Sequence, residues 1–386
     1  MKPAHDTVTV LHYTSLWLPR TEIWLYHQVL HLPADIDSQV VCEATTNLDQ
    51  FPFPNLHSLS HASWIESNWD KGLRKLRVRN HLGLLVRLSR KLKPQIVHSH
   101  FGNVGWANQN AVRKLGARHI TTFYGLDVNH LPAVDPRWRM RYRDLFAEVD
   151  CILCEGPHMA GCITALGCPE DKVRVHHLGV RLDDIPYCPR NWQPGTPLRV
   201  LIAGTFREKK GIPLALAALG RVRREFPIEL TIIGDATSEP RSQAEKRRIL
   251  SALDAEGLRP HTRLLGFRTH GELMQEAYDH QVFLSPSITA RDGDTEGGAP
   301  VTILEMAASG MPVVSTRHCD IPQVLPPGTP LADEGDVPGL VQRLYGLVEN
   351  AGRWGRQLSA TRDHVEQNFN AATQGKRLAE IYRECL

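Results

Sequence analysis

Short apolar runs alternate with helical hydrophobic patterns along almost the whole chain, which is typical of proteins built on parallel sheets. The runs read as two sets of buried strands, one in each half of the sequence. The first set comprises residues 7–13, 39–44, 95–100, 118–124, 150–155 and 173–178, and the second comprises 198–204, 229–235, 262–267, 281–287 and 311–316. This alternation predicts two doubly wound α/β domains, with ligands held in the loops beyond the carboxyl ends of the strands.

A proline-rich segment, DIPYCPRNWQPGTP at 184–197, separates the two sets of strands. Proline removes a backbone donor and stiffens the chain, so this composition predicts a linker. We therefore expect an N-terminal domain over residues 1–185, a linker over 186–197 and a C-terminal domain over 198–365. The last helix, 366–386, is expected to cross back to the N-terminal domain.

Length and composition agree with a soluble protein of two domains. The chain has 386 residues, too many for one ordinary core, and 42% of them are hydrophobic while 23% are charged. A net charge of +3 is too small to indicate nucleic-acid binding. The start, MKPAHDTVTV, lacks the apolar stretch of a signal peptide, and no segment approaches the roughly 18 apolar residues of a membrane span, so we expect a cytoplasmic protein. The lone C-x-x-C pair, Cys151 and Cys154, reads as a buried strand end and not as a metal site.

The segment 71–94 stands out because it holds nine Lys or Arg residues and no acid. Its leucines recur at roughly helical spacing, which predicts an amphipathic helix. Two interpretations remain open. The helix is a solvated surface element packed by its leucines, or it is a basic surface attracted to anionic lipid headgroups, with Trp64 and Trp69 upstream as interfacial anchors.

The stretch EGGAPVTILEMAASG, residues 296–310, predicts a helix that begins with Pro300 in its first turn and ends at Gly310. The two glycines that precede it, Gly297 and Gly298, allow backbone amides to approach an anion at the helix start.

The same helix is apolar except for a narrow stripe formed by Thr302, Glu305 and Ser309. An ionised carboxylate at Glu305 costs several kcal/mol in apolar surroundings unless a partner compensates it. Such a carboxylate could accept two hydroxyl protons, for example those of a ribose, while phosphates occupy the helix start. The alternative is that the stripe faces water.

Five motifs together resemble those of the family-4 glycosyltransferases, which are retaining enzymes of the GT-B fold, two Rossmann-like domains facing a cleft. The resemblance is closest to the branch that acts in bacterial exopolysaccharide and lipopolysaccharide assembly. The motifs are LPRTEIW (18–24), VHSHFG (97–102), TTFYGLDV (121–128), REKKGI (207–212) and SPSITARDGDTEGGAPVTILEMAASGMPVVST (285–316). The last two together are the most specific.

The resemblance implies roles for individual residues of the second domain. Glu305 would hold the ribose hydroxyls of the nucleotide, Glu296 would contact the donor sugar, and Lys210 would neutralise the diphosphate. The remaining residues expected to line the nucleotide sugar are Thr205, Arg207, Gly297, Gly298, Ala299 and Pro300.

The sequence departs from the family pattern at three places. Eight residues separate Glu296 from Glu305 where the family has seven, so one has been added in the glycine segment. Thr205 stands where the family usually carries its phosphate-binding arginine, and Arg207 is the expected substitute. Tyr124 stands where a histidine often lies beside the donor sugar.

In the first domain, the resemblance places His100 with Tyr124 among the catalytic residues. Arg20, Glu22 and Asp127 are expected on the acceptor side. His98 is interpreted as a strand histidine whose hydrogen bonds are satisfied.

We expect no metal and no cofactor. Lys210, Arg207 and the helix start would stabilise the leaving diphosphate without a cation. The Asp292-Gly293-Asp294 sequence has the form of a cation-binding Asp-x-Asp, but it is interpreted as part of the family loop.

The resemblance thus implies a metal-independent hexosyltransferase that moves a sugar from a nucleotide-diphosphate sugar to a saccharide acceptor, lipid-linked in some pathways. Such an enzyme would work in the cytoplasm, peripherally at the inner face of the membrane. A nucleotide-sugar epimerase of the same fold is one alternative, and products formed without any acceptor would favour it. A non-catalytic two-domain sugar-binding protein is another, and a failure to turn over with every acceptor tested would favour that.

Overall fold

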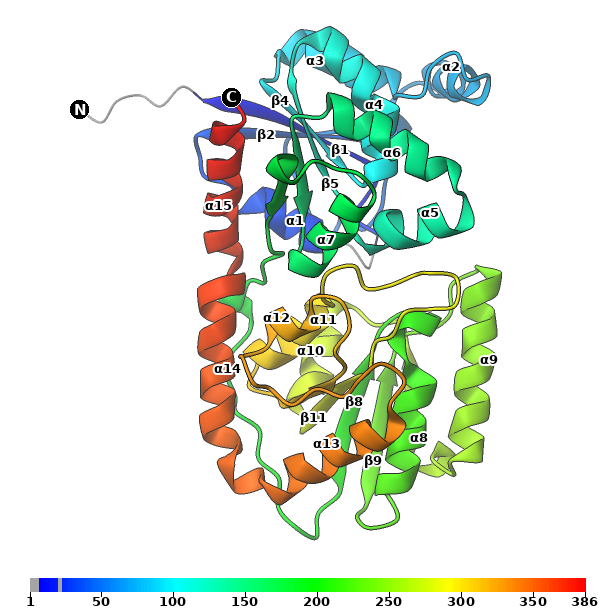
Figure 1. The fold of residues 1–386 in the computed structure, drawn as a ribbon, viewed down its shortest axis with the longest axis vertical. Helices are drawn as coiled ribbons and strands as arrows, with labels where there is room; N and C mark the ends of the chain where they lie inside the picture. Colours follow the sequence, from blue (N-terminus) through cyan, green and yellow to red (C-terminus); the bar gives the residue numbers. More distant parts are fainter. Residues whose placement is uncertain (1–6, 20–22) are drawn as a thin grey trace, which may run out of the picture. The chain divides into compact units, whose positions relative to one another are not determined.

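The computed structural model describes residues 7–19 and 23–386 of the chain, which divides into two compact units (Figure 1). Unit 1 consists of Met1–Gly179 together with Ala371–Leu386, and unit 2 consists of Val180–Asn370. The boundaries therefore fall a few residues from those expected from the proline-rich segment.

The proline-rich segment belongs to unit 2 because Arg190 anchors it there. The Arg190 side chain is buried and donates hydrogen bonds to the carbonyl oxygens of Ala277, His280 and Ser309. A guanidinium has five donors and needs several acceptors when it leaves water, so this residue fixes the segment against the unit 2 core. The segment is thus a packed part of unit 2 and differs from the linker expected.

Among the described residues of unit 1, seven strands form one parallel sheet in the order β3-β2-β1-β4-β5-β6-β7. The strands are β1 Val8–Trp17, β2 Ile36–Thr45, β3 Leu56–Ser58, β4 Ile96–His100, β5 Arg118–Thr122, β6 Cys151–Cys154 and β7 Val173–Val175. The sequence predicted all of them except β3, which is only three residues long. The central strand β4 is buried at every position, as expected for a parallel strand covered on both faces.

Helices cover the sheet of unit 1, and the last helix of the chain is one of them (Figure 1). They are α1 Ile23–Leu30, α2 Trp64–Lys75, α3 Gly83–Leu92, α4 Gly102–Leu115, α5 Leu131–Val134, α6 Arg137–Glu148, α7 Pro157–Ala165 and α15 Ala371–Glu384. Helix α15 packs on α1, where Gly375 lies against the carbonyl of His31 so closely that a Cβ would fall 2.0 Å from its oxygen.

Unit 2 contains a parallel sheet of five strands in the order β10-β9-β8-β11-β12. Its strands are β8 Leu198–Ala203, β9 Ile228–Ile233, β10 Thr262–Gly266, β11 Val282–Ser285 and β12 Val313–Ser315. Its helices are α8 Ile212–Val222, α9 Pro240–Ala255, α10 His270–Tyr278, α11 Val301–Ala308, α12 Ile321–Val324, α13 Val337–Glu349 and α14 Trp354–Phe369. All five strands lie where the sequence predicted them, and the predicted fold class of two doubly wound parallel-sheet domains is confirmed.

In each unit the strand order changes direction once, and that point positions the polar loops. The reversal lies between β1 and β4 in unit 1 and between β8 and β11 in unit 2. Loops that leave the carboxyl ends of such neighbouring strands diverge and leave room for a ligand.

The prediction of one long helix over 71–94 is wrong, because the chain breaks it into α2 and α3. Asp70, just outside the basic segment, is buried and accepts the backbone N–H of Gly83 at 2.7 Å and the Arg74 Nε–H at 2.9 Å. Arg79 also pairs with it. The turn between the helices wraps around this carboxylate, and Arg77 there adopts a left-handed φ of 57°.

Within the part of the chain that the structure describes, no helix is both long enough and apolar enough to cross a membrane.

Candidate active site

Residues predicted to bind a nucleotide sugar gather in unit 2, in the loops that follow β8 and β11. Lys210 lies on the 3-10 turn Glu208–Lys210 after β8, and its ammonium group donates to Glu296 Oε2 at 2.9 Å. Glu296 lies in the loop after β11, where its Oε1 accepts from the hydroxyl of Ser287 at 2.9 Å. Since β8 and β11 are the neighbours at which the strand order reverses, the structure brings the two predicted residues together where ligands bind in this class of sheet.

The Glu296 carboxyl group stays ionised although its side chain is only 5% exposed. Burial raises the pKa of this group, but the positive charges of Lys210 and Lys209 outweigh burial and lower the pKa to about 2. An ionised carboxylate only accepts hydrogen bonds, so at neutral pH Glu296 is suited to accept from hydroxyl groups.

A second layer of cations neutralises the two aspartates of the 292–294 sequence. Lys209 donates to Asp294 Oδ1 at 3.1 Å, and Arg241 donates to Asp292 Oδ2 at 2.9 Å. These contacts agree with the interpretation of the aspartates as loop residues, because their carboxylates already face protein cations.

Arg207 lies at the same edge of the sheet, two residues beyond Thr205. Its guanidinium donates to Glu239 Oε1 at 2.7 Å and approaches Asp294 Oδ2 at 3.9 Å. Thr205 is half-buried in the loop that links β8 to this arginine. The arginine therefore lies with Lys209 beside Asp294, and its role as the substitute for a phosphate-binding arginine stays a prediction.

Gly211, the glycine of the E-K-K-G sequence, is required by both space and backbone conformation. Its φ is 61°, and a Cβ would lie 1.9 Å from the carbonyl oxygen of Pro286. The next loop packs on this turn as well, since Ile288 N–H donates to the Lys209 carbonyl at 2.8 Å. The glycine thus allows the loops after β8 and β11 to touch.

Glu305 lies on α11, where its carboxylate accepts a hydrogen bond from His270 Nε2 at 2.8 Å. The Glu305 side chain is 13% exposed, so it neither points freely into water nor is fully enclosed. A capping box formed by Thr269 and Glu272 fixes His270 at the first position of α10. The hydrogen bond that His270 donates to Glu305 raises the pKa of His270, and burial opposes this.

The helix start differs slightly from the prediction, and the polar stripe is not uniform. Pro300 is the N-cap of α11 and not its first helical residue. Ser309 is fully buried and accepts from Arg190 at 3.2 Å, so it serves the packing of the proline-rich segment. Glu305 and the half-buried Thr302 are the members of the stripe that reach the surface.

The glycine segment before α11 is tied down by hydrogen bonds. Gly297 has a φ of 79° and donates its N–H to the Thr295 hydroxyl at 3.2 Å. The carbonyl of Gly298 accepts from Asp320 N–H at 3.1 Å. Ala299 follows, half-buried, before the helix begins. The added residue is therefore accommodated in an ordered turn.

In unit 1, Tyr124 and His100 lie together beyond the carboxyl ends of β5 and β4. The Tyr124 hydroxyl is hydrogen-bonded to His100 Nδ1 at 2.9 Å, and His100 Nε2 is hydrogen-bonded to His12 Nδ1 at 3.2 Å. Trp24 packs on the Tyr124 ring with 4.4 Å between ring centroids. The structure thus brings the two predicted residues together and extends them by His12.

His98 is satisfied, as the sequence interpretation held. Its Nδ1 is hydrogen-bonded to the Tyr382 hydroxyl at 2.7 Å and its Nε2 to Thr122 Oγ1 at 2.6 Å. His12, His98 and His100 come close enough to share a metal ion. Burial lowers the pKa of each of them, to about 3 for His12, so the rings are neutral. Both nitrogens of His98 and His100, however, already have hydrogen-bond partners. We interpret the three rings as a hydrogen-bonded core network.

The expectation that Asp127 binds acceptor hydroxyls disagrees with its position. Asp127 is fully buried, and its carboxylate accepts the backbone N–H groups of Gly102 at 2.5 Å and Tyr124 at 2.8 Å. Burial raises its pKa to about 7, although these N–H donors oppose the rise. The side chain therefore holds two loop backbones and presents neither oxygen to a substrate. The other predicted acceptor-side residues, Arg20 and Glu22, lie outside the described residues.

Comparison with known proteins agrees with this geometry. The family "Glycosyltransferase Family 4" matches residues 21–184, and the family "Glycosyl transferases group 1" matches residues 197–350. The chain is 30% identical over 291 residues to a putative colanic acid biosynthesis glycosyltransferase, WcaL, of Escherichia coli, covering 73% of this chain and 69% of the relative. It is 31% identical over 288 residues to the amylovoran biosynthesis glycosyltransferase AmsK of Erwinia amylovora, covering 73% and 68%.

The chain belongs to glycosyltransferase family 4.

Solved structures of low sequence identity share the fold of this glycosyltransferase. The sucrose-phosphate synthase of Thermosynechococcus elongatus superposes with a TM-score of 0.75 at 17% identity over 98% of both chains. Anabaena Alr3699/HepE, in complex with UDP-glucose, superposes with a TM-score of 0.75 at 15% identity over 97% of this chain and 99% of the other. These likenesses confirm the GT-B fold that the motifs implied.

Sequence reasoning missed several residues at the site of this glycosyltransferase. His270 and His318 both contact the predicted glutamates, through the Glu305 carboxylate and the Glu296 backbone respectively. Lys209 was also missed, because only its neighbour Lys210 was chosen from the E-K-K-G sequence. That sequence was the one signal that could have identified Lys209. Neither histidine stands in a motif, so only the folded chain reveals them.

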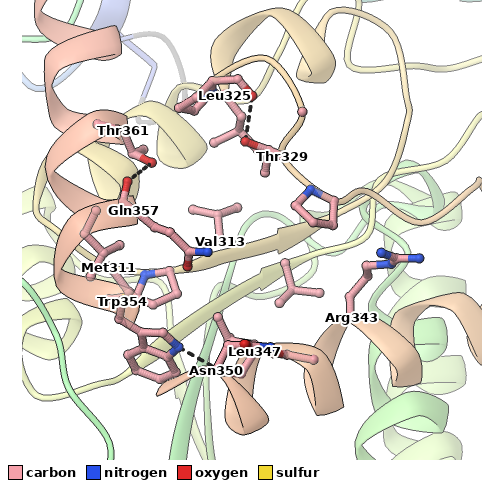
Figure 2. A pocket seen from close by; sticks show the side chains of 18 of the residues that line it. Met311, Val313, Leu325, Thr329, Arg343, Leu347, Asn350, Trp354, Gln357 and Thr361 are labelled. Atoms are coloured by element: carbon pink, nitrogen blue, oxygen red, sulfur yellow. Dashed lines mark hydrogen bonds between the residues drawn. The ribbon is translucent and has the colours of Figure 1, made fainter. Parts of the chain in front are cut away.

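The glycosyltransferase also contains a cavity of about 430 Å³ that none of the predicted site residues lines. It lies in unit 2 beside the edge strand β12, between the start of α14 and the proline-rich loop near Thr329 (Figure 2). Met311, Val313, Leu325 and Trp354 give it a mainly apolar wall, with Arg343 at one side.

Proposed function

We propose that this glycosyltransferase moves a sugar, with retention of configuration, from a nucleotide-diphosphate sugar to a saccharide acceptor in the synthesis of a bacterial cell-surface polysaccharide. The observation that carries the proposal is the contact between Lys210 and Glu296 at the switch point of unit 2. The names of the relatives WcaL and AmsK, which concern colanic acid and amylovoran, support the polysaccharide assignment.

The donor site is proposed to use four charged residues, each of which contacts a different part of the nucleotide sugar or supports such a contact. Lys210, supported by Arg207, would stabilise the diphosphate as it leaves, because negative charge grows there in the transition state. Glu296 would accept hydrogen bonds from sugar hydroxyls, and Glu305 would accept those of the ribose. The fold neighbour HepE was crystallised with UDP-glucose, which supports a nucleotide sugar as the class of donor.

We infer that the reaction needs no divalent cation. Lys210 and Lys209 supply positive charge beside Glu296, while Asp292 and Asp294 are neutralised by cations of the protein, Arg207 among them. A metal at these aspartates would have to displace those partners first.

The acceptor is proposed to be lipid-linked, which would require the enzyme to reach a membrane. Five apolar side chains of α2 and the following turn are more than two-thirds exposed: Trp64, Ile65, Trp69, Leu76 and Val78. Figure 1 shows α2 projecting from the side of unit 1. Exposed Lys71, Lys75 and Arg77 flank these side chains. Apolar side chains ringed by basic ones are the surface expected of an interfacial element on an anionic membrane, and we call these eight residues the α2 face.

A thermal-shift screen with UDP, GDP, ADP and CDP tests the donor assignment. A nucleoside diphosphate present at about 100 times its dissociation constant stabilises the protein by about 2.7 kcal/mol, so one of the four should raise Tm clearly. Inorganic diphosphate is the control for charge alone. A flat response to all four nucleotides would contradict a nucleotide-sugar donor.

A further inference from the structure

His318 is a fully buried histidine that contacts the backbone of Glu296. The Glu296 N–H donates to His318 Nε2 at 3.1 Å. A backbone N–H can only donate, so Nε2 must be the unprotonated nitrogen of the ring. The opposite nitrogen, Nδ1, therefore carries the proton and donates it to Glu334 Oε1 at 2.6 Å.

Glu334 in turn holds the other end of the same loop. Its Oε2 accepts the backbone N–H of Thr289 at 2.7 Å. Burial raises the pKa of Glu334, but the hydrogen bonds from Thr289 and His318 outweigh burial and lower it. One carboxylate thus connects the beginning of the loop after β11 directly, at Thr289, and its end through His318, at Glu296.

The backbone of unit 2 brings His318 and Glu334 together. Arg317 N–H donates to the Ala332 carbonyl at 2.7 Å, and Ala332 N–H donates to the Ser315 carbonyl at 3.1 Å. These backbone bonds continue the pairing at the edge of β12 and place the two side chains beside each other. They do not involve the loop that carries Glu296.

Cys319 lies beside the same nitrogen. Its thiol is 3.2 Å from His318 Nε2, and burial raises the pKa of this thiol to about 12, so it remains protonated at neutral pH. The residue has a left-handed φ of 46°, which is uncommon for a side chain other than glycine. Next to it, Asp320 N–H donates to the Gly298 carbonyl at 3.1 Å. The segment 318–320 therefore holds the backbone at Glu296 and at Gly298, in the segment that contains the added residue.

We propose that His318, oriented by Glu334, is a positioning residue that holds Glu296 in place to bind the donor sugar. This inference rests on the proposed function. The Glu296 carboxylate is fixed by Lys210 and Ser287, and its backbone is fixed by His318. These contacts hold the side chain at the switch point, although the glycine segment that follows it makes a turn. Loss of the histidine removes the hydrogen bond to the Glu296 backbone, so the position of the carboxylate becomes less well defined.

The closing experiment compares His318→Leu, which removes donor and acceptor, with His318→Gln, whose amide offers both. Arg317→Gln is the matched control, because Arg317 is the neighbouring residue and forms an exposed ion pair with Asp333 at 2.9 Å. Calorimetry measures the affinity for UDP, GDP, ADP or CDP, whichever binds the wild type most tightly, and for its glucose conjugate.

We expect His318→Leu to leave the affinity for the nucleoside diphosphate within about twofold. The preference for the glucose conjugate, which is its affinity relative to that of the nucleoside diphosphate, and the turnover should both fall by about 10- to 100-fold. His318→Gln recovers part of the loss, and Arg317→Gln changes neither quantity. In a Glu296→Ala background, His318→Leu adds nothing, because without the Glu296 carboxylate there is no sugar contact left for His318 to position.

Additive losses in that background, or an unchanged preference in His318→Leu, would overturn the positioning role while leaving the proposed function intact. A wild-type protein that binds none of the four nucleotides would overturn the proposed function and this inference with it. If His318→Leu fails to fold, Glu334→Ala replaces it, because that carboxylate side chain is 34% exposed and leaves no cavity. In the Glu334→Ala variant, a reduced preference for the glucose conjugate supports the positioning role, and an unchanged preference overturns it.

Discussion

Glu296 and Glu305 are both glutamates with little solvent exposure, but their carboxylates are stabilised by different partners. Glu296 is almost fully enclosed and is paired with a permanent cation, whereas Glu305 is paired with a histidine whose charge depends on pH. A buried carboxylate beside a lysine keeps its charge across the physiological range. A carboxylate beside a histidine loses the charged form of its partner as pH rises. The two glutamates are therefore expected to respond differently to substitution and to pH.

Glu305→Gln is expected to weaken nucleoside diphosphate binding by about tenfold while the fold is retained, because hydrogen bonds to a charged group are stronger than those to a neutral amide. Calorimetry with the nucleotide found in the thermal-shift screen measures the change. Glu366→Gln is the control, since that residue is 53% exposed on α14. Equal affinities in both variants would remove Glu305 from the site.

Lys210→Ala is expected to lower kcat by about 100-fold with a smaller change in the KM for the donor, because its charge matters most as the diphosphate leaves. Lys210→Arg keeps the charge beside Glu296, controls for the loss of that ion pair and should retain part of the turnover. Steady-state kinetics with varied donor and varied acceptor separate the parameters. Unchanged kcat with a raised acceptor KM would place Lys210 on the acceptor side.

His270 provides a prediction of pH dependence. The hydrogen bond that it donates to Glu305 raises its pKa, so the pair contributes stability fully below the unfolded pKa of histidine and loses it as pH rises through the folded pKa. The Tm difference between wild type and His270→Asn should therefore be largest near about pH 6 and shrink toward about pH 9. Thermal unfolding across that range measures it, and a difference that grows with pH would show that His270 is not stabilised by its charge.

At the scale of elements, the break between α2 and α3 changes which basic residues are available. Arg74 is hydrogen-bonded to Glu43 at 2.7 Å and to Asp70, and Arg79 is paired with Asp70. Reversing these two charges would disrupt the turn around Asp70. The exposed Lys71, Lys75 and Arg77 are free of that role, so they are the charges with which to test membrane binding.

Reversal of Lys71, Lys75 and Arg77 to Glu is expected to reduce co-sedimentation with anionic vesicles by roughly 100-fold at low salt, at about 1 kcal/mol per basic residue. Trp64→Ala with Trp69→Ala should weaken binding that persists at high salt. The matched control reverses the exposed Arg221, Arg224 and Arg247 of unit 2. If the triple reversal behaves like this control, the α2 face is an ordinary solvated surface.

At the scale of the whole molecule, each doubly wound unit presents polar residues at the carboxyl ends of its strands. The loops of unit 2 gather Lys210, Glu296 and Arg207, and the strand ends of unit 1 gather Tyr124 and His100. In both units these side chains come from strands that are adjacent in the sheet but distant in the sequence. The division of the chain into two units therefore gives two separate sets of functional groups.

The complete enzyme is expected to retain its turnover within about twofold in excess EDTA, because protein cations take the role that a divalent ion has in metal-dependent transferases. Activity measured after exhaustive chelation, with and without added Mn²⁺, checks this. Magnesium-loaded buffer is the control. A loss restored by Mn²⁺ would make Asp292 and Asp294 metal ligands.

The sequence by itself determined the elements whose signal is local. Buried parallel strands are continuous apolar runs, so eleven of the twelve described strands were predicted, and only the three-residue β3 was missed. The isolated Glu305 was recognisable for the same reason, because an unusual polar position is visible in a short window. The resemblance of the E-K-K-G and E-G-G-A-P sequences to family motifs pointed to Lys210 and Glu296 before any contact was known.

Only the tertiary structure decided which side chains meet. The partners of the predicted glutamates, His270 and His318, lie 35 and 22 residues away in the sequence, and the topology of the sheet brings them into contact. Asp127 shows the reverse case, because a carboxylate in a functional motif proved to hold two backbone amides. The break after α2 likewise depends on one buried aspartate, Asp70, and the N–H of a residue thirteen positions later. Hydrophobic patterning records which positions are buried, but hydrogen bonds between distant segments depend on distances that exist only once the chain has folded.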